Sequence, residues 1–209
     1  MKILITGSAG FIGFHLSKKL LELNHIIYGI DNLNNYYDTR LKKNRIKELK
    51  KFKKFHFKKL NLANKNAILK HLKKKKIDLI INMAAQAGVR YSISYPQKYF
   101  ESNVLGFFNL IEIARENKIK NIVSASTSSV YGENKKLPFS EEDRVDNIIQ
   151  FYAVSKRSNE IMGQVYSKIY MMNFTFLRFF TVYGPWGRPD MALAKFVTNI
   201  IKRKKIDVF

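Results

Sequence analysis

Tyr152 and Lys156 lie four residues apart in the segment YAVSK, and a phenol and an amine at that spacing could handle a proton together. On a helix, residues four apart share one face, so both side chains would point in the same direction. A neighbouring ammonium favours a phenolate and would lower the pKa of Tyr152 from its ordinary value of about 10. Taken alone, the spacing is also that of an ordinary pair on a helix surface.

A glycine-rich segment, GSAGFIG, places Gly7, Gly10 and Gly13 between a predicted strand (2–6) and a predicted helix (14–23). In that context the first glycine permits a tight turn, the second lets the backbone approach a pyrophosphate, and the third lets the helix pack closely on the strand. The helix N-terminus then offers free N–H groups and a partial positive charge to the phosphates. The pattern therefore predicts a dinucleotide-binding site.

Asp31 stands at the end of the second predicted strand. A carboxylate at that position can accept hydrogen bonds from both ribose hydroxyls of adenosine, and it would repel a 2′-phosphate. The sequence therefore favours NAD over NADP as the cofactor.

Strands alternate with helices along the chain, which predicts a doubly wound α/β fold with a mostly parallel sheet and helices on both faces. The expected strands are 2–6, 25–31, 52–60, 77–85, 120–126 and 173–180; the expected helices are 14–23, 38–51, 63–75, 97–117, 151–168 and 191–203. Residues 32–37 and 127–150 are expected to be loops, and 204–209 to begin a further strand. The hydroxyl-rich run 124–129 then follows a strand, where open α/β sheets bind ligands. Within it, Ser124 and Ser126 are interpreted as structural.

The composition is that of a globular protein, with 46% hydrophobic residues among 209. The absence of cysteine excludes thiolate metal sites, and the four histidines show no metal-ligand spacing, so no metal is expected. The net charge of +22 could attract nucleic acid, but the lysines stand in runs beside apolar residues at helical or strand spacing. We therefore expect a solvated basic surface and no nucleic-acid partner. Without a secretory signal or a membrane-length apolar stretch, we expect a cytoplasmic protein with no membrane insertion.

Together these features resemble the extended short-chain dehydrogenase/reductase family, and within it the nucleotide-sugar 4-epimerases, most closely those acting on UDP-glucuronate. The segments that carry the resemblance are ITGSAGFIG, GIDNLNNYYD, NMAAQAGVRYSI, SNVLGFFNLIE, STSSVYG, YAVSK and LRFFTVYGPWGRPDMAL. The resemblance covers residues 1–209 and implies one Rossmann-type NAD-binding domain, with a substrate-binding segment that starts near residue 181. Because family members continue well beyond this length, the small C-terminal substrate domain is expected to be largely missing.

By this resemblance, Tyr152 is the catalytic base, Lys156 its partner, and Thr127 the hydroxyl that hydrogen-bonds the reacting sugar. NAD is the implied cofactor, with contacts from Gly7, Gly10, Phe11, Ile12, Gly13, Asp31, Asn32, Asn61, Leu62, Ala84, Ala85, Tyr152 and Lys156. Phe11 and Ile12 belong to this set by position, although their apolar side chains suit the core equally well. Asn61 stands where the family usually has an aspartate near the adenine.

The implied reaction is a transient oxidation at C4 of a nucleotide sugar, rotation of the 4-keto sugar and reduction from its other face. The expected substrate contacts are Ser128, Ser129, Thr181, Arg188 and Arg90. Related dehydratases and decarboxylases carry an acid just after the catalytic threonine, where this chain has serines. A guanidinium binds a carboxylate in a planar fork, so Arg188 suits a uronate; a loop salt bridge with Asp190 is its alternative role. For Arg90, a role in loop structure is equally open.

Two other functions stay open on the sequence alone. The chain could epimerise a neutral nucleotide such as UDP-glucose, or it could bind NAD without turning a substrate over. The resemblance also implies a homodimer formed through the helices 97–117 and 151–168.

Overall fold

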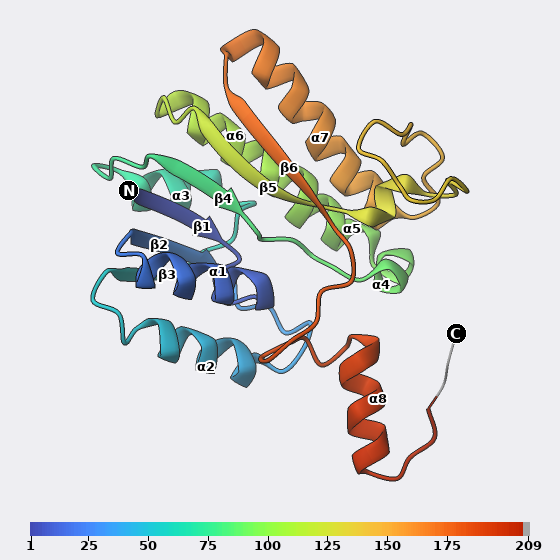
Figure 1. Ribbon diagram of the computed structural model, residues 1–209. Helices are drawn as coiled ribbons and strands as arrows, with labels where there is room; N and C mark the ends of the chain where they lie inside the picture. Colours follow the sequence, from blue (N-terminus) through green and yellow to red (C-terminus); the bar gives the residue numbers. More distant parts are fainter. Residues whose placement is uncertain (207–209) are drawn as a thin grey trace.

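Six short strands form one parallel sheet, as the alternating sequence pattern predicts (Figure 1). The computed structural model describes residues 1–206. The strands are β1 (Lys2–Thr6), β2 (Ile26–Asp31), β3 (Phe55–Lys59), β4 (Leu79–Asn82), β5 (Asn121–Thr127) and β6 (Asn173–Phe179). Their order across the sheet is β3-β2-β1-β4-β5-β6, which is the order of a dinucleotide-binding Rossmann fold.

The helices connect these strands and lie near the predicted positions. Their bounds are α1 (Phe11–Glu22), α2 (Thr39–Leu49), α3 (Lys65–Leu72), α4 (Val89–Ser94), α5 (Pro96–Tyr99), α6 (Gly106–Glu116), α7 (Phe151–Tyr170) and α8 (Ala192–Ile201), with a π-helical turn η1 (Phe100–Leu105) and a 3-10 turn η2 (Ser128–Tyr131). The single helix expected over 97–117 is thus α5, η1 and α6 in succession. The short α4 was not predicted, and η2 occupies the start of the expected loop 127–150.

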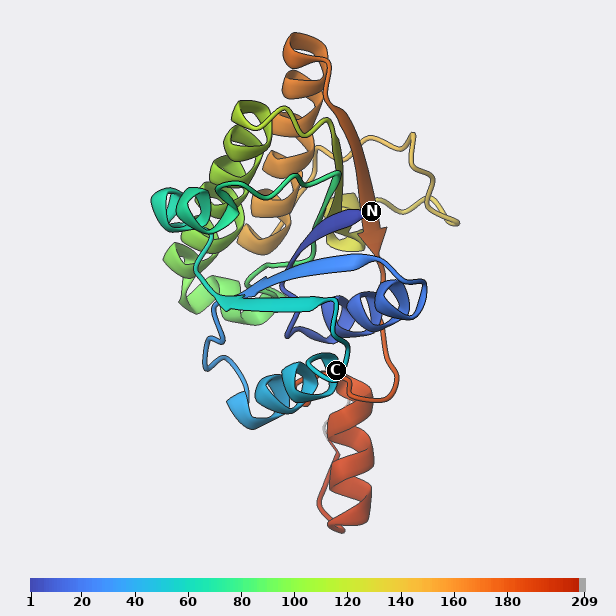
Figure 2. The same ribbon diagram turned by 90° about the vertical axis from the view of Figure 1, so that its left-hand side faces the viewer.

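The two faces of the sheet are covered by different helices, so the central strands are apolar on both sides. Leu4 of β1 packs in a core with side chains of α3 and α6, such as Ile68 and Leu110. Its neighbours Ile3 and Ile5 point the other way, into a core with side chains of α1 and α2. Figures 1 and 2 show α6 and α7 on one side of the sheet and α1 and α2 on the other.

Beyond β6 the chain leaves the sheet. Residues 180–191 run as a loop past α1 and α2, and α8 then stands away from the sheet and carries no buried residue (Figures 1 and 2). Residues 204–206 are not in a strand, and residues 207–209 lie outside the described part, so the further strand expected over 204–209 stays a prediction. Among the described helices, none is long and apolar enough to cross a membrane.

Candidate active site

A cavity of about 900 Å³ opens at the carboxyl ends of the parallel strands. It is lined by the loops that follow β1, β2, β4, β5 and β6, which is where a doubly wound sheet binds ligands. Every site residue expected from the sequence lies along it: Gly7, Gly10, Phe11, Ile12, Gly13, Asp31, Asn32, Asn61, Leu62, Ala84, Ala85, Arg90, Thr127, Ser128, Ser129, Tyr152, Lys156, Thr181 and Arg188. Their roles stay predictions, but the fold gathers them in one place.

The glycine loop forms a backbone cradle at one end of this cavity. Gly7 has φ +69°, and a Cβ built there would lie 2.6 Å from the backbone nitrogen of Ala84. A Cβ on Gly13 would lie 2.1 Å from the carbonyl oxygen of Gly7. Neither position can accept a side chain without moving backbone, so the α1 N-terminus lies tight against the strand ends. This geometry fits a pyrophosphate bound by backbone N–H groups.

Asp31 is buried at the end of β2, next to the glycine loop. Its Oδ2 accepts a hydrogen bond of 3.1 Å from the backbone N–H of Ala9, and its Oδ1 accepts one of 2.8 Å from Leu33. Burial raises the pKa of Asp31, while those backbone bonds and the ammonium of Lys42 act in the opposite direction. Each carboxylate oxygen keeps a further lone pair for a ligand hydroxyl. The site therefore fits an adenosine ribose.

Asn61, the residue expected near the adenine, is less enclosed than Asp31. Its Oδ1 accepts a hydrogen bond of 3.1 Å from the backbone N–H of Ala63, and the side chain is exposed at the cavity edge. Its amide oxygen can still accept a second hydrogen bond, so the predicted adenine contact stays open.

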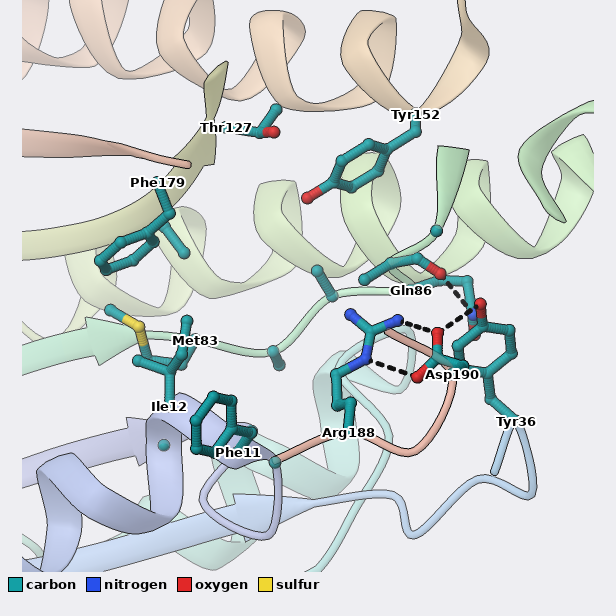
Figure 3. A pocket seen from close by; sticks show the side chains of 18 of the residues that line it. Phe11, Ile12, Tyr36, Met83, Gln86, Thr127, Tyr152, Phe179, Arg188 and Asp190 are labelled. Atoms are coloured by element: carbon teal, nitrogen blue, oxygen red, sulfur yellow. Dashed lines mark hydrogen bonds and ion pairs between the residues drawn. The ribbon is translucent and has the colours of Figure 1, made fainter. Parts of the chain in front are cut away.

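Tyr152 and Lys156 occupy one face of α7, as their spacing predicts. Figure 3 shows the hydroxyl of Tyr152 pointing into the cavity. Lys156 is buried, and its Nζ has no hydrogen-bond partner among the described residues. An unpartnered ammonium beside a dinucleotide cradle fits a hydroxyl donated by a ligand, such as that of the nicotinamide ribose.

The expected lowering of the Tyr152 pKa is wrong. Burial raises the pKa of Tyr152, although the Thr127 hydroxyl and the Arg188 guanidinium act in the opposite direction. Lys156 is not among the groups that lower the pKa of Tyr152, and burial lowers the pKa of Lys156 itself to about 8, against the weaker effect of Glu160. Burial disfavours both the phenolate of Tyr152 and the ammonium of Lys156. The spacing of the two residues along the helix could not predict this burial.

Thr127 ends β5 and forms the N-cap of the turn η2. Its Oγ1 accepts a hydrogen bond of 3.2 Å from the backbone N–H of Ser129, which fixes the hydroxyl beside the Tyr152 side chain (Figure 3). Ser124 and Ser126, interpreted as structural from the sequence, both make hydrogen bonds within the fold. The Ser124 hydroxyl accepts a hydrogen bond from Asn82, and that of Ser126 donates one of 2.6 Å to Glu160.

Arg188 forms an ion pair with Asp190 at the edge of the cavity, two residues further along the same loop (Figure 3). Its Nε and Nη2 donate to the carboxylate of Asp190 at 3.0 Å and 2.5 Å, and the Tyr36 hydroxyl donates to the same carboxylate at 3.1 Å. The salt bridge weighed from the sequence is therefore present. It uses one edge of the guanidinium and leaves Nη1 turned toward the cavity and Tyr152, where it can donate to an anion.

The fold has counterparts among known proteins. The model of the NAD dependent epimerase/dehydratase family matches residues 3–209. The chain belongs to this family. A UDP-glucuronic acid 4-epimerase from Bacillus cereus, solved with UDP-glucuronic acid and NAD, superposes with a TM-score of 0.93 at 35% identity, over 100% of this chain and 66% of that one.

Two curated relatives of this epimerase/dehydratase family member extend the likeness. Protein CapI of Staphylococcus aureus is 49% identical over 100% of this chain and 62% of its own length. A probable UDP-glucuronate 4-epimerase of Rhizobium meliloti is 44% identical over 100% of this chain and 61% of its own. The chain thus spans somewhat less than two thirds of the length of these relatives.

Several cavity residues of this family member were not expected from the sequence. They are Tyr36, Lys42, Met83, Gln86 and Phe179, together with Asp190 as a lining residue. Tyr36 and Lys42 come from the segment that follows β2, which meets the loop after β6 only through the fold. The tyrosines of NNYYD, directly after Asp31, are the one local signal that could have suggested their inclusion.

Proposed function

We propose that the protein catalyses NAD-dependent 4-epimerisation of a UDP-uronic acid, interconverting UDP-glucuronate and UDP-galacturonate. The observation that carries the proposal is the convergence on one cavity of the glycine cradle, the Tyr152–Lys156 face of α7, and Arg188. The first suits a dinucleotide, the second suits proton transfer, and the third suits a carboxylate. The names of the Rhizobium meliloti relative and the Bacillus cereus structure support the same reaction.

In this proposal NAD lies along the strand ends, with its pyrophosphate on the glycine loop and its adenosine ribose on Asp31. When bound, NAD accepts a hydride from C4 of the sugar and later returns it. The unpartnered Nζ of Lys156 donates a hydrogen bond to the nicotinamide ribose, which replaces the hydration that burial removes.

Tyr152 removes the proton from the sugar 4-hydroxyl and gives it back after the keto sugar has turned. For this the phenol must ionise, and burial opposes ionisation in the protein without ligand. The hydrogen bond from Thr127 and the positive charge of Arg188 both lower the pKa of Tyr152, so they favour the phenolate that the reaction needs. Ser128 and Ser129 are neutral, which leaves no acid directly after Thr127 to drive elimination.

A uronate substrate would give Arg188 a carboxylate to bind in the cavity. After oxidation at C4 the sugar is a β-keto acid, which loses carbon dioxide when the bond to its carboxylate aligns with the ketone. A guanidinium that holds this carboxylate in a planar fork restrains that alignment. Thr181, Arg90, Ser128 and Ser129 line the same cavity and serve as further substrate contacts in this proposal.

We also propose that the protein is a homodimer that uses α6 and α7. Both helices carry exposed apolar side chains, among them Leu105 and Phe108 along η1 and α6, and Val154, Ile161 and Val165 on α7. Those of α7 recur on one face, as in a helix that packs against a partner.

Incubation with UDP-glucuronate tests the function directly, with separation of UDP-galacturonate by anion-exchange chromatography and measurement of NAD bound to the purified protein. Parallel incubation with UDP-glucose distinguishes a neutral-sugar epimerase, which would form UDP-galactose instead. Bound NAD without conversion of either nucleotide would support the third possibility, a protein that binds the cofactor but does not turn over substrate.

A further inference from the structure

Arg45, on α2, is a buried cation that the proposed reaction does not use. Its Nη1 donates hydrogen bonds to the carbonyl of Ala9 at 2.9 Å and to the hydroxyl of Tyr37 at 2.7 Å. Its Nη2 donates to the carbonyl of Gly187 at 3.4 Å and to that of Trp186. One guanidinium thus joins the glycine loop to the loop between β6 and α8, which runs beside α2 in Figure 1.

Burial of a guanidinium is costly unless its donors are satisfied, and the partners of Nη1 and Nη2 reduce that cost, while Nε has no partner among the described residues. The guanidinium is planar and its donors form a rigid fork. The carbonyls on its two sides are therefore held in a fixed mutual position. A lysine could keep the charge, but it could not bridge the two loops in the same way.

The peptide group of Ala9 is held on both sides. Its N–H donates to Oδ2 of Asp31 at 3.1 Å, and its carbonyl accepts the bond from Arg45. A continuous set of hydrogen bonds therefore leads from Asp31, the expected ribose ligand, through Ala9 and Arg45 to Trp186.

The loop at the other end of this set depends on outside support. Gly184 and Gly187 close a turn, with a backbone hydrogen bond of 3.0 Å, and Trp186 within it has φ +60°. That region costs a residue with a side chain roughly 1–2 kcal/mol. Besides Arg45, the turn is held by His15, whose Nε2 lies 2.8 Å from the carbonyl oxygen of Pro185. Because Arg188 comes two residues after Trp186, the conformation of this turn determines where Arg188 lies.

We propose that Arg45 couples occupation of the dinucleotide site to the position of the loop that carries Arg188. The inference rests on the proposed function in taking a dinucleotide as the ligand of the glycine loop. A pyrophosphate on that loop and a ribose on Asp31 restrain the Ala9 peptide. Because Arg45 binds the Ala9 carbonyl on one side and the carbonyls of Trp186 and Gly187 on the other, it restrains the turn as well. The turn is therefore ordered before the sugar nucleotide binds. Arg45 is a positioning residue, and the dinucleotide is the first ligand to bind.

Trp186 is the only tryptophan of the chain, and the residue is 40% exposed, so tryptophan fluorescence reports on this turn alone. Quenching by acrylamide should weaken by about a factor of two when saturating NAD shifts the turn toward its ordered state. ADP-ribose, which has the pyrophosphate and the adenosine ribose but no nicotinamide, should protect Trp186 equally. Binding of both ligands is measured separately, by isothermal titration calorimetry.

Arg45→Lys should abolish this protection, while the affinity for NAD falls by less than about fivefold, in line with a coupling of modest size. Arg40→Lys is the matched control, because Arg40 lies on the same helix, is exposed and pairs only with Asp38 among the described residues. In Arg40→Lys, NAD should protect Trp186 from acrylamide quenching as much as in the wild type. Circular dichroism establishes that both variants are folded.

The outcomes separate the two proposals. NAD that binds to the wild type without any change in Trp186 quenching overturns the coupling and leaves the proposed function standing. Equal protection in wild type and Arg45→Lys also overturns it. Failure of the wild type to bind NAD or ADP-ribose overturns the proposed function and the coupling with it. Should Arg45→Lys not fold, the wild-type measurement with ADP-ribose decides by itself.

Discussion

The side chain of Lys156 shows how strongly the fold changes a single group. It is fully enclosed, its ammonium has no partner among the described residues, and burial lowers its pKa from 10.5 to about 8. At neutral pH the amine is still mostly protonated, so the folded chain carries a buried charge without a hydrogen-bond partner among the described residues. A ligand hydroxyl that accepts a hydrogen bond from this ammonium would relieve that cost and so contribute to affinity.

We expect this residue to make stability depend on pH when no nucleotide is present. Between pH 8 and 10.5 the unfolded chain keeps the Lys156 proton while the folded protein releases it, so the unfolded state binds more protons. Stability must then rise with pH across this window, and the gain is lost again as the pH falls from 10.5 to about 8. The full effect is on the order of 3 kcal/mol.

Urea unfolding at pH 7.5 to 10.5 tests this by comparison of wild type with Lys156→Met. The wild type should gain stability relative to the variant as the pH rises. Lys168→Met, at an exposed position of the same helix, should follow the wild type. Parallel pH curves for wild type and Lys156→Met would mean that the amine is not desolvated.

Arg188 carries the second prediction at this scale. Replacing it with leucine should weaken binding of UDP-glucuronate by roughly 10- to 100-fold, which corresponds to loss of a hydrogen bond between charged groups. Binding of UDP-glucose should change little, because that sugar has no carboxylate. Competition binding with both nucleotides measures the difference, with the exposed Arg144→Leu as control. Equal losses for the two nucleotides would remove the argument for a uronate.

At the scale of elements, α7 is joined to β5 and β6 by one buried carboxylate. Glu160 accepts hydrogen bonds from Arg178 of β6 at 3.1 Å and 3.0 Å, from Ser126 of β5 at 2.6 Å, and from Arg157 at 2.9 Å. Burial of Glu160 would raise its pKa, but these donors outweigh it and lower the pKa. The helix that carries Tyr152 and Lys156 is thus fixed to the strand at the sheet edge.

Glu160→Gln should therefore destabilise the protein by about 3 kcal/mol, because it leaves two arginines next to a group without charge. Urea unfolding at pH 7 measures the loss. Glu48→Gln is the control, since Glu48 forms an exposed pair with Lys51 and should cost no more than about 0.5 kcal/mol. A loss for Glu160→Gln as small as that of the control would contradict a structural role for this network.

Elements with strong local patterns could be predicted from the sequence, and those set by distant contacts could not. Residues 2–23 predict a strand, a glycine turn and a helix without an alternative, because the hydrophobic periodicity and the position of the glycines indicate the same boundaries. The π-helical turn η1 and the short α4 have no such signature. Asn103 in η1 donates to the carbonyl of Gln86 and to Ser155, and only the assembled fold supplies those partners.

The same division holds for the site. Residues at the carboxyl ends of strands, such as Asp31 and Thr127, were predicted because topology alone brings those ends together. Tyr36 and Arg45 were not, because their partners Asp190 and Trp186 lie more than a hundred residues away in the chain. The direction of the Tyr152 pKa was missed for a related reason, since burial depends on the whole assembly.

At the scale of the whole molecule, the charge of +22 and the exposed apolar helices act in opposite directions on self-association. Like charge keeps copies apart, whereas an apolar face on α7 brings them together. Ile161 and Val165 are 48% and 45% exposed and lie one turn apart on that face. Their position on the outer side of α7 leaves the cavity on the opposite side of the helix, so association would not close it.

Val165→Asp should convert the proposed dimer to a monomer, since a carboxylate buried between two copies has no cation to pair with in the stripe formed by Val154, Ile161 and Val165. Sedimentation velocity at several protein concentrations and at two salt concentrations measures the change, because salt screens the repulsion between the basic surfaces. Leu23→Asp, at an exposed site on the far end of α1, should leave the dimer intact. NAD binding should survive in both variants. A wild type that sediments as a monomer at every concentration would place these apolar side chains outside any interface between copies.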